Sequence, residues 1–359
     1  MKIIDWYIIK KYLGTFVYSL SLLILVVIVF DISEKIDTFI RHHAPLHAII
    51  FQYYVNFIPY FVNLFIYLFS FIAVVFFTSR LAGNSEIIAM LSSGISFRRL
   101  LRPYMIVAVF LAVFSFLLRG FILPITNHNL RIFMNKYVDV LTKDNQRNIH
   151  VQLAPGTFAY VESYNVKRHT GYRFALEKYK GEKLVYKLNS NKIVRDTVAH
   201  KWVIYNYYIF HFNANGSQRI QSGFMKDTTL VLKPTDLYKI KHRYEEMNYF
   251  QLNRYIREEK ARGSLSYKRY EVEKYKRYAA PVAILILTLL GVSLTSRKIR
   301  GGMGMHLGLG LLLAFAYILF MQISDVFSTQ GNLSPSIGVW IPNFIFLVIA
   351  LFLLEKAPK

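Results

Sequence analysis

Cysteine is absent from all 359 residues of the sequence. Disulfide bonds and thiolate metal sites both need cysteine sulfur, so neither is available to this chain. Disulfides mark proteins of oxidising compartments, and the sequence carries no such marker. A metal site would have to be built from histidine and carboxylate ligands alone.

Common enzyme motifs are missing as well. There is no G-x-x-x-x-G-K-[ST] phosphate loop, and the dipeptide Gly-Lys does not occur. Because that loop cradles the phosphates of ATP, this chain cannot form the cradle itself, and an ATPase would be a separate subunit. The motifs H-E-x-x-H and G-x-S-x-G are also absent, which argues against a metalloprotease or an α/β-hydrolase. No catalytic residues are predicted, and the chain is not expected to be an enzyme.

Long apolar runs are abundant instead. Hydrophobic residues make up 54% of the chain and its mean hydropathy is +0.31, which is too apolar for a soluble globule of this size. A helix needs about 20 apolar residues to cross a bilayer. Segments near that length cover residues 12–30, 57–79, 104–123, 279–295, 305–327 and 338–354. The sequence therefore predicts an α-helical polytopic membrane protein with six transmembrane helices in two groups of three.

The pattern changes between the two groups, from about residue 125 to 275. Short stretches rich in Tyr, Val, Ile and Phe are separated by turn signals, such as those at 180–181 and 215–216. The clearest stretches are 157–164, 183–194 and 202–212. We expect an inserted all-β domain of the sandwich or jelly-roll type. The predicted domains are a first bundle half (1–124), the β domain (125–275) and a second bundle half (276–359).

Basic residues in short loops predict the orientation in the membrane, because Lys and Arg resist translocation. Two loops are basic and should be cytoplasmic, the first with Arg80, Arg98, Arg99 and Arg102 and the second with Arg297, Lys298 and Arg300. The intervening loops, at 31–47 and around Asp325, are mixed or acidic. With six spans, both termini are then cytoplasmic and the β domain lies outside, in the periplasm of a cell that has one.

Positive charge is concentrated in the β region rather than spread along the chain. Residues 125–278 hold 29 Lys and Arg against 14 Asp and Glu, and the whole chain has a formal charge of +23. In a soluble protein such a surplus suggests nucleic acid binding, but here it lies in a predicted extracytoplasmic domain. The charge favours an anionic partner there or simply aids solubility, and no nucleic acid partner is expected.

A short helix is predicted at about residues 84–94, between the second and third spans. An Asn or Ser cap precedes it, Glu86 stands in its first turn and Gly94 ends it. Ile87, Met90 and Leu91 give it an apolar surface too short to span a membrane. That surface must lie on the membrane, pack on the spans, or enter a groove of another protein.

Basic residues beside the first span are candidates for contact with lipid. Lys35 and Arg41 follow the predicted end of that span. They either extend toward lipid headgroups as solvated side chains or grip phosphates of a bound lipid, and sequence position alone does not separate these. The histidines at 42, 43 and 47 have no carboxylate placed to complete a metal site, so no metal is predicted.

The segment Ser79–Ser96 gives the strongest resemblance to a known family. It combines an acidic residue, an apolar helix and an end formed by small residues and a glycine. The basic stretches Phe97-Arg98-Arg99 and Arg102-Pro103 follow. With residues 44–127 and the order of parts, it resembles the lipopolysaccharide-export permease family LptF/LptG, also called YjgP/YjgQ, over nearly the whole chain. Supporting matches are Arg277–Pro281, Ser296-Arg297-Lys298 with the glycines that follow, and Trp340–Asn343.

This resemblance implies a half-transporter of the ATP-binding-cassette type in the bacterial inner membrane. Its implied partners are a sister permease, a cytoplasmic ATPase dimer that uses ATP and Mg, a periplasmic jelly-roll bridge protein, and a single-span anchor protein; this chain itself needs no cofactor. The short helix would dock in the ATPase, with Glu86 facing a basic residue and Ile87, Met90 and Leu91 buried against it. Lys35 and Arg41 lie where the family places basic contacts to lipopolysaccharide phosphates.

Within the family, residues 31–37 look more like LptG, which makes the sister permease LptF-like. Two readings from other classes stay open. An ion-coupled secondary transporter would need ionisable residues near the middle of the spans, where none is identified. A membrane scaffold would use the basic β domain to bind an anionic lipid or polymer.

Overall fold

A computed structural model describes residues 3–138, 146–166, 168–196, 201–213, 217–228, 230–237, 243–296 and 302–357. The chain forms two compact units. The first, the helical bundle, comprises Met1–Phe133, Tyr244–Leu252 and Lys268–Lys359, and the second, the β unit, comprises Met134–Arg243 and Asn253–Tyr267. The predicted turn at 215–216 and the basic loop with Arg297, Lys298 and Arg300 lie outside the described residues.

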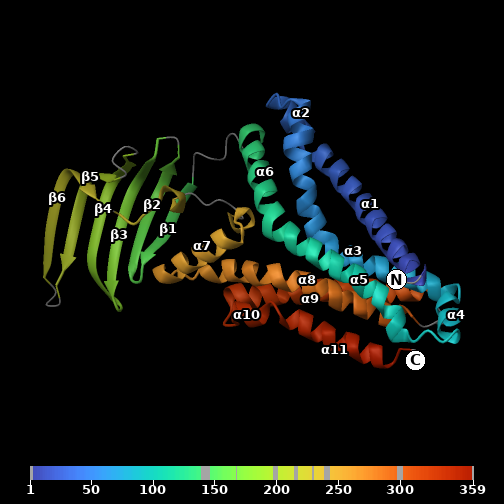
Figure 1. The fold of residues 1–359 in the computed structure, drawn as a ribbon. Helices are drawn as coiled ribbons and strands as arrows, with labels where there is room; N and C mark the ends of the chain where they lie inside the picture. Colours follow the sequence, from blue (N-terminus) through green and yellow to red (C-terminus); the bar gives the residue numbers. More distant parts are fainter. Residues whose placement is uncertain are drawn as a thin grey trace. The chain divides into compact units, whose positions relative to one another are not determined.

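Six helical rods are long and apolar enough to cross a membrane, and each predicted apolar segment lies within one of them. They are built from α1 (Ile3–Arg41), α2 (Leu46–Ala48) with η1 (Ile49–Tyr54) and α3 (Val55–Gly83), α5 (Phe97–Leu117) with η2 (Leu118–Ile122) and α6 (Leu123–Tyr137), α8 (Tyr267–Thr295), α9 (Gly302–Gln330), and α10 (Pro335–Gly338) with α11 (Ile341–Glu355) (Figure 1). The predicted six-span fold is confirmed.

The helices extend beyond the apolar segments that predicted them. At a rise of about 1.5 Å per residue, the 39 residues of α1 reach about 58 Å, well beyond the thickness of the hydrocarbon layer. Residues 31–41, expected in an outer loop, therefore form the last turns of α1. Asp325, also expected in a loop, lies inside α9. Hydropathy marks the apolar part of a helix and misses its polar continuation.

Two rods contain a short π-helical stretch, and each stretch precedes a proline. Pro59 follows η1, and Pro124 follows η2. A proline ring clashes with the carbonyl four residues earlier, which is that of Val55, directly after η1, or of Gly120, within η2. Widening the helix at that point lets the rod continue through the proline.

Helix α8 is the centre of the bundle. In the most apolar window of α8, 67% of residues are buried within the chain, against 11% in α1 and 22% in α9. Glycines bring α3 close to its neighbours, because a Cβ at Gly291 would lie 2.9 Å from Val74 Cγ1 and one at Gly310 would lie 2.8 Å from Val75 Cγ1. Helices α1 and α9 thus keep large apolar faces free of contact with the rest of the described chain.

The β unit is built on one antiparallel sheet of six strands, which Figure 1 shows side by side. The strands are β1 (Gln146–Ala154), β2 (Thr157–Asn165), β3 (Thr170–Lys180), β4 (Lys183–Arg195), β5 (Trp202–Phe212) and β6 (Gln218–Thr228). Each described strand pairs with its neighbours in sequence, so the sheet is a meander. The inserted β domain is confirmed. Among the described connections, tight turns at Pro155-Gly156 and Gly181-Glu182 join neighbouring strands.

Along a strand, every second residue normally points to the buried face. At one row of residues across the sheet this alternation shifts by one residue, from even-numbered to odd-numbered positions or the reverse. In β5, for example, Trp202 and Ile204 are buried on one side of Asn206, and Tyr207 and Ile209 on the other. Asn148, Arg173 and Asn206 lie in this row on alternate strands and have positive φ values of 56°, 51° and 51°. From β2 to β5 the pairing register is the same on both sides of the row. Each of these strands therefore carries one extra residue at the row, and the buried face stays continuous.

The buried face of the sheet is covered by the segment that follows β6. Trp202 is fully buried, and its indole Nε1 donates a hydrogen bond of 2.8 Å to the carbonyl oxygen of Leu232. Leu232 and Leu237 belong to the same core as the sheet. The ends of the predicted β region are helical, since α6 runs to Tyr137, α7 covers Tyr249–Arg262 and α8 begins at Tyr267.

Candidate functional site

Helix α4 (Glu86–Ser92) forms the predicted short helix between α3 and α5. Ser85 occupies the N-cap position in a left-handed conformation, with φ 61°, and its side chain makes no capping hydrogen bond. The helix stops at Gly94, where φ is +86°, a conformation that glycine adopts without steric cost. The amides of Gly94 and Ile95 donate to the carbonyls of Leu91 and Met90, which is the Schellman arrangement.

The predicted apolar face of α4 packs on the chain's own bundle. Ile87 is fully buried in a core that includes Ile8, Phe97 and Leu100, and Met90 and Leu91 pack partly buried against the same core. The large apolar side chain of α4 that faces outward is Ile88, which is 47% exposed. Helical spacing groups residues 87, 90 and 91 on one face but does not say what that face contacts.

Glu86 stands at the edge of the exposed face of α4. Its Oε2 accepts a hydrogen bond of 3.1 Å from the hydroxyl of Tyr7, and its Oε1 accepts one of 3.2 Å from Nδ2 of Asn84. It makes no ion pair with any cation of the described part of the chain. A carboxylate has about four acceptor positions, so Glu86 can still accept a cation from outside.

Lys35 lies in a polar cluster at the far end of α1. It forms an ion pair with Asp31, one helical turn earlier, and donates to the hydroxyl of Tyr53. The hydroxyls of Tyr53 and Tyr54 also donate to Asp31, over 3.0 and 3.3 Å. The ammonium lies 5.1 Å from the ring centre of Tyr53 and 5.6 Å from that of Phe57. The structure thus gives Lys35 a set of partners within its own chain, and the i, i+4 spacing of residues 31 and 35 could have predicted the first of them.

Arg41 differs from Lys35, because it is exposed and makes no ion pair with the described residues. It ends α1. His42 and His43 follow directly in a turn, and His47 lies in α2. His42 Nδ1 lies 3.1 Å from the carbonyl oxygen of Thr38, while His43 and His47 are exposed. Within the described ranges, no group of three His, Asp or Glu side chains is arranged to hold a metal ion.

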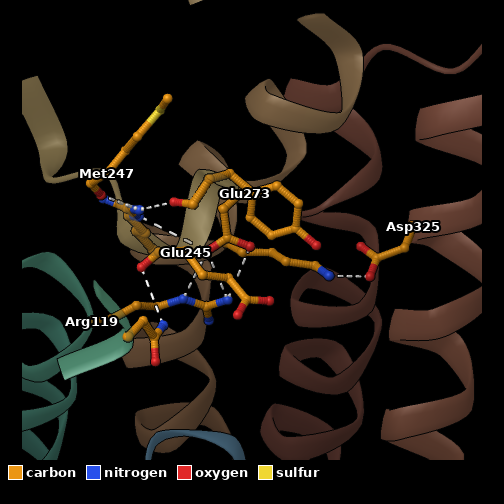
Figure 2. A network of polar contacts seen from close by, with 9 residues as sticks. Arg119, Glu245, Met247, Glu273 and Asp325 are labelled. Atoms are coloured by element: carbon orange, nitrogen blue, oxygen red, sulfur yellow. Dashed lines mark hydrogen bonds and ion pairs between the residues drawn. The ribbon is translucent and has the colours of Figure 1, made fainter. Parts of the chain in front are cut away.

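A network of ionic contacts joins three helices near one end of the bundle (Figure 2). Arg119 in η2 pairs with Glu273 in α8, with Nη2 3.1 Å from Oε1. Lys276, one turn further along α8, pairs with Asp325 in α9. Sequence reasoning missed both pairs, although Asp325 gave a signal, since an acid beside an apolar run is costly without a partner.

The same network holds the segment that returns from the β unit. Arg277 is 3% exposed, and its Nη2 donates to the carbonyl oxygens of Tyr244 and Met247 over 3.0 and 2.8 Å. From α6, Asn127 donates to the carbonyl oxygen of Glu245 over 3.2 Å. Figure 2 shows Glu245 and Met247 beside these side chains. The entry of the chain into α8 is thereby fixed on the bundle.

A sequence model of the lipopolysaccharide export system permease family LptF/LptG matches residues 6–356 of this chain. The match includes all six spans and the inserted β unit. The chain belongs to the LptF/LptG family. No curated protein matches it significantly.

Membership in LptF/LptG makes this chain a multi-pass inner-membrane permease for lipopolysaccharide export and not itself an enzyme. The match does not distinguish the LptF type from the LptG type. Helix α4 contacts one end of α1, through Tyr7 and Glu86, and Lys35 and Arg41 lie toward the other end.

Proposed function

We propose that this chain is one permease half of an ATP-driven exporter that takes lipopolysaccharide from the outer leaflet of the inner membrane toward a periplasmic jelly-roll bridge protein. The observation that carries the proposal is α4, which is anchored through Ile87 and leaves Glu86 and Ile88 available to a partner. The chain has no phosphate loop, so the energy must come from another subunit. Exposing acyl chains costs about 0.8 kcal/mol per CH₂, which thermal energy cannot supply for a whole lipid.

In this proposal α4 docks in a groove of a cytoplasmic ATPase dimer, and a sister permease supplies the other half of the channel. Glu86 attracts a basic residue of the ATPase, and Ile88 supplies the exposed apolar contact. Met90 and Leu91 are partly buried on the bundle and contribute only their outer edges. Both termini are then cytoplasmic and the β unit is periplasmic, in agreement with the basic loops.

The test is affinity purification of the tagged chain in mild detergent, wild type beside Glu86→Lys and Ile88→Ser. The wild type should bring down an ATPase and a second six-span permease, and both variants should lose the ATPase while keeping the permease. Glu355→Lys is the matched control, because this exposed acid lies at the end of α11 and outside α4. A wild-type chain that purifies alone would contradict the proposal.

For the lipid, we propose that Arg41 makes the first contact with headgroup phosphates and that Lys35 acts from within its cluster. Arg41 is exposed at the end of α1, whereas Lys35 is already paired with Asp31. Arg41→Glu should reduce photo-crosslinking to lipopolysaccharide while ATPase association survives. Lys35→Glu should reduce crosslinking and also lower thermal stability, because a second carboxylate would face Asp31. Unchanged crosslinking in Arg41→Glu would remove this assignment.

The β unit offers an edge for handing lipid onward. Strand β6 is the last strand of the sheet, so its outer edge is unpaired among the described strands, and most of its side chains are exposed. An exposed strand edge is a template for pairing with another strand. We propose that a jelly-roll bridge protein adds to this sheet, with a single-span anchor protein as a further partner.

The charged residues inside the spans bear on the ion-coupled alternative. Two ion pairs link α8 to its neighbours, Arg119 with Glu273 and Lys276 with Asp325. The pairs lie toward the ends of α8 and α9 rather than at their centres. An ion-binding site needs acceptors at mid-membrane that are free to take the ion. The pairs therefore favour a structural role.

A further inference from the structure

The first turns of α1 are joined to α4 and α5 by two polar contacts that docking of an ATPase does not require. The hydroxyl of Tyr7 donates to Glu86 Oε2 over 3.1 Å. Two guanidinium nitrogens of Arg99 donate to the two carboxylate oxygens of Asp5, both over 2.7 Å. The Asp5 side chain is buried and that of Arg99 is 28% exposed, so this forked ion pair lies at the edge of the bundle.

Apolar packing lies directly beneath these contacts. Ile8 from α1 and Ile87 from α4 are both fully buried in one core, together with Phe97 and Leu100 from α5. These shared apolar contacts join the three helices beside a small pocket lined by Ile8, Arg99 and Leu100. Helix α4 therefore cannot shift without moving the first turns of α1 or breaking these contacts.

Helix α1 is a single uninterrupted rod from these contacts to the Lys35 cluster. Near its start the hydroxyl of Tyr12 is bonded to Ser70 in α3 over 2.6 Å and to Thr288 in α8 over 3.0 Å. Beyond Tyr12, large side chains such as Tyr18 and Phe30 are exposed, at 72% and 73%. The far end of the same rod is held by the Lys35 cluster, where Asp31 accepts from Tyr53. A continuous helix tied at both places carries a displacement of residues 5–8 along its length to residue 35.

We propose that Asp5, Tyr7 and Arg99 form a clasp that passes movement of α4 to α1, so that a partner acting on α4 repositions Lys35 and Arg41. This inference rests on the proposed function, which supplies the partner. The three residues are positioning residues, since they act through α1 and touch no lipid. Docking and the clasp are compatible, because Tyr7 and Asn84 use only two of the acceptor positions of Glu86.

The test follows the far end of α1 in the purified export complex. The chain has no cysteine, so Ile36→Cys and Ile337→Cys introduce the only two thiols of this subunit, both at exposed positions in α1 and α10. Spin labels there report the distance before and after trapping with ATP and vanadate. The labelled chain should shift on trapping, and so should a Lys10→Gln control, which alters an exposed cation beside the clasp.

Arg99→Asp and Asp5→Arg should each keep the ATPase bound and hydrolysing but lose the shift at residue 36. The double variant Asp5→Arg with Arg99→Asp should recover most of it, because the pair is restored with its charges exchanged. Tyr7→Phe, which removes one hydrogen bond and no volume from the core, should give a smaller shift without affecting folding.

The outcomes separate the two proposals. If no ATPase accompanies the unmodified chain, the proposed function fails and the clasp fails with it. If the ATPase is bound but the distance does not change on trapping, only the clasp is overturned. If the ATPase is bound and Arg99→Asp shifts like the unmodified chain, only the clasp is overturned. Loss of the ATPase from Arg99→Asp would also overturn it, by making Arg99 a docking residue.

Discussion

At the residue scale, Tyr12 shows how a buried hydroxyl fixes a helix inside the bundle. It is fully buried and shares hydrogen bonds with Ser70 and Thr288 on two other helices. Tyr12→Phe keeps the ring but leaves both partner hydroxyls without this bond, so we expect a loss of about 1 kcal/mol in stability. Thermal unfolding in detergent measures the loss. Tyr18→Phe is the control, since Tyr18 is 72% exposed, and an equal loss there would contradict the assignment.

The sequence predicted which residues build the short helix, but it did not predict what their side chains contact. The sequence identified Glu86, Ile87 and Gly94 as parts of one short helix, and it predicted the glycine stop that the structure confirms. It could not tell whether Ile87 or Ile88 faces a partner, because the two are adjacent on a helix whose other contacts come from α1 and α5. Contacts between residues 79 positions apart, such as Tyr7 with Glu86, have no local signal.

At the element scale, the pair of Lys276 and Asp325 joins α8 to α9. Their side chains are 24% and 16% exposed. Removing one partner leaves an uncompensated charge, so Asp325→Leu alone should destabilise the chain by about 3 kcal/mol. Lys276→Met with Asp325→Leu should recover most of that loss, since an apolar pair can replace a buried ion pair.

The same double variant distinguishes a structural role from ion coupling. A structural pair predicts that the double variant supports lipopolysaccharide export in cells that depend on this chain, whereas an ion-coupling pair predicts that export is lost despite normal folding. Thermal unfolding in detergent and growth of the complemented cells are the two measurements. Recovery of stability without recovery of export would count against the structural reading.

In the β unit, one cross-strand pair gives a pH-dependent contribution to stability. Glu177 on β3 faces Lys187 on β4, and the hydrogen bond from Lys187, 2.9 Å from Oε1, lowers the pKa of Glu177. A lowered carboxyl pKa stabilises the fold above the unfolded value of about 4.3, and the contribution disappears as pH falls through the lower folded value. Glu177→Gln should therefore cost about 0.5 kcal/mol at neutral pH and almost nothing well below pH 4.

Hydrogen exchange of the β3 and β4 amides in the whole chain measures this difference, after correction for the intrinsic pH dependence of exchange. Asp227→Asn is the matched control, because Asp227 is exposed on β6 and makes no ion pair with the described residues. A difference between Glu177→Gln and wild type that persists at low pH would assign the effect to packing instead of charge.

Helices and strands were predicted correctly where a single pattern of apolar residues runs through the whole segment. The stretches predicted at 183–194 and 202–212 coincide with β4 and β5 to within a residue. The sequence does not reveal that the buried alternation of β5 shifts by one residue at Asn206. That shift depends on a neighbouring strand that carries the same extra residue. The helical ends of the predicted β region were missed because polar turns of α6 and α8 lack an apolar run.

At the scale of the whole molecule, the chain is a helical bundle with a β unit inserted as two segments, Met134–Arg243 and Asn253–Tyr267. The bundle and the insertion were both predictable from composition. The segment that re-enters the bundle is held by Arg277 and Asn127, residues whose role depends on backbone carbonyls 30 or more positions away. Such contacts set how the insertion is joined to the bundle, and they arise only once the helices are packed.

The proposed orientation of the molecule rests on the basic loops and can be tested directly because the chain has no cysteine. Glu182→Cys places a thiol in the exposed turn between β3 and β4, and Ser93→Cys places one at the exposed end of α4. A maleimide that cannot cross the inner membrane should label Glu182→Cys in cells with a permeabilised outer membrane and label Ser93→Cys only after the inner membrane is broken. The reverse labelling pattern would mean that the chain has the opposite orientation in the membrane. A cytoplasmic ATPase could then not reach α4.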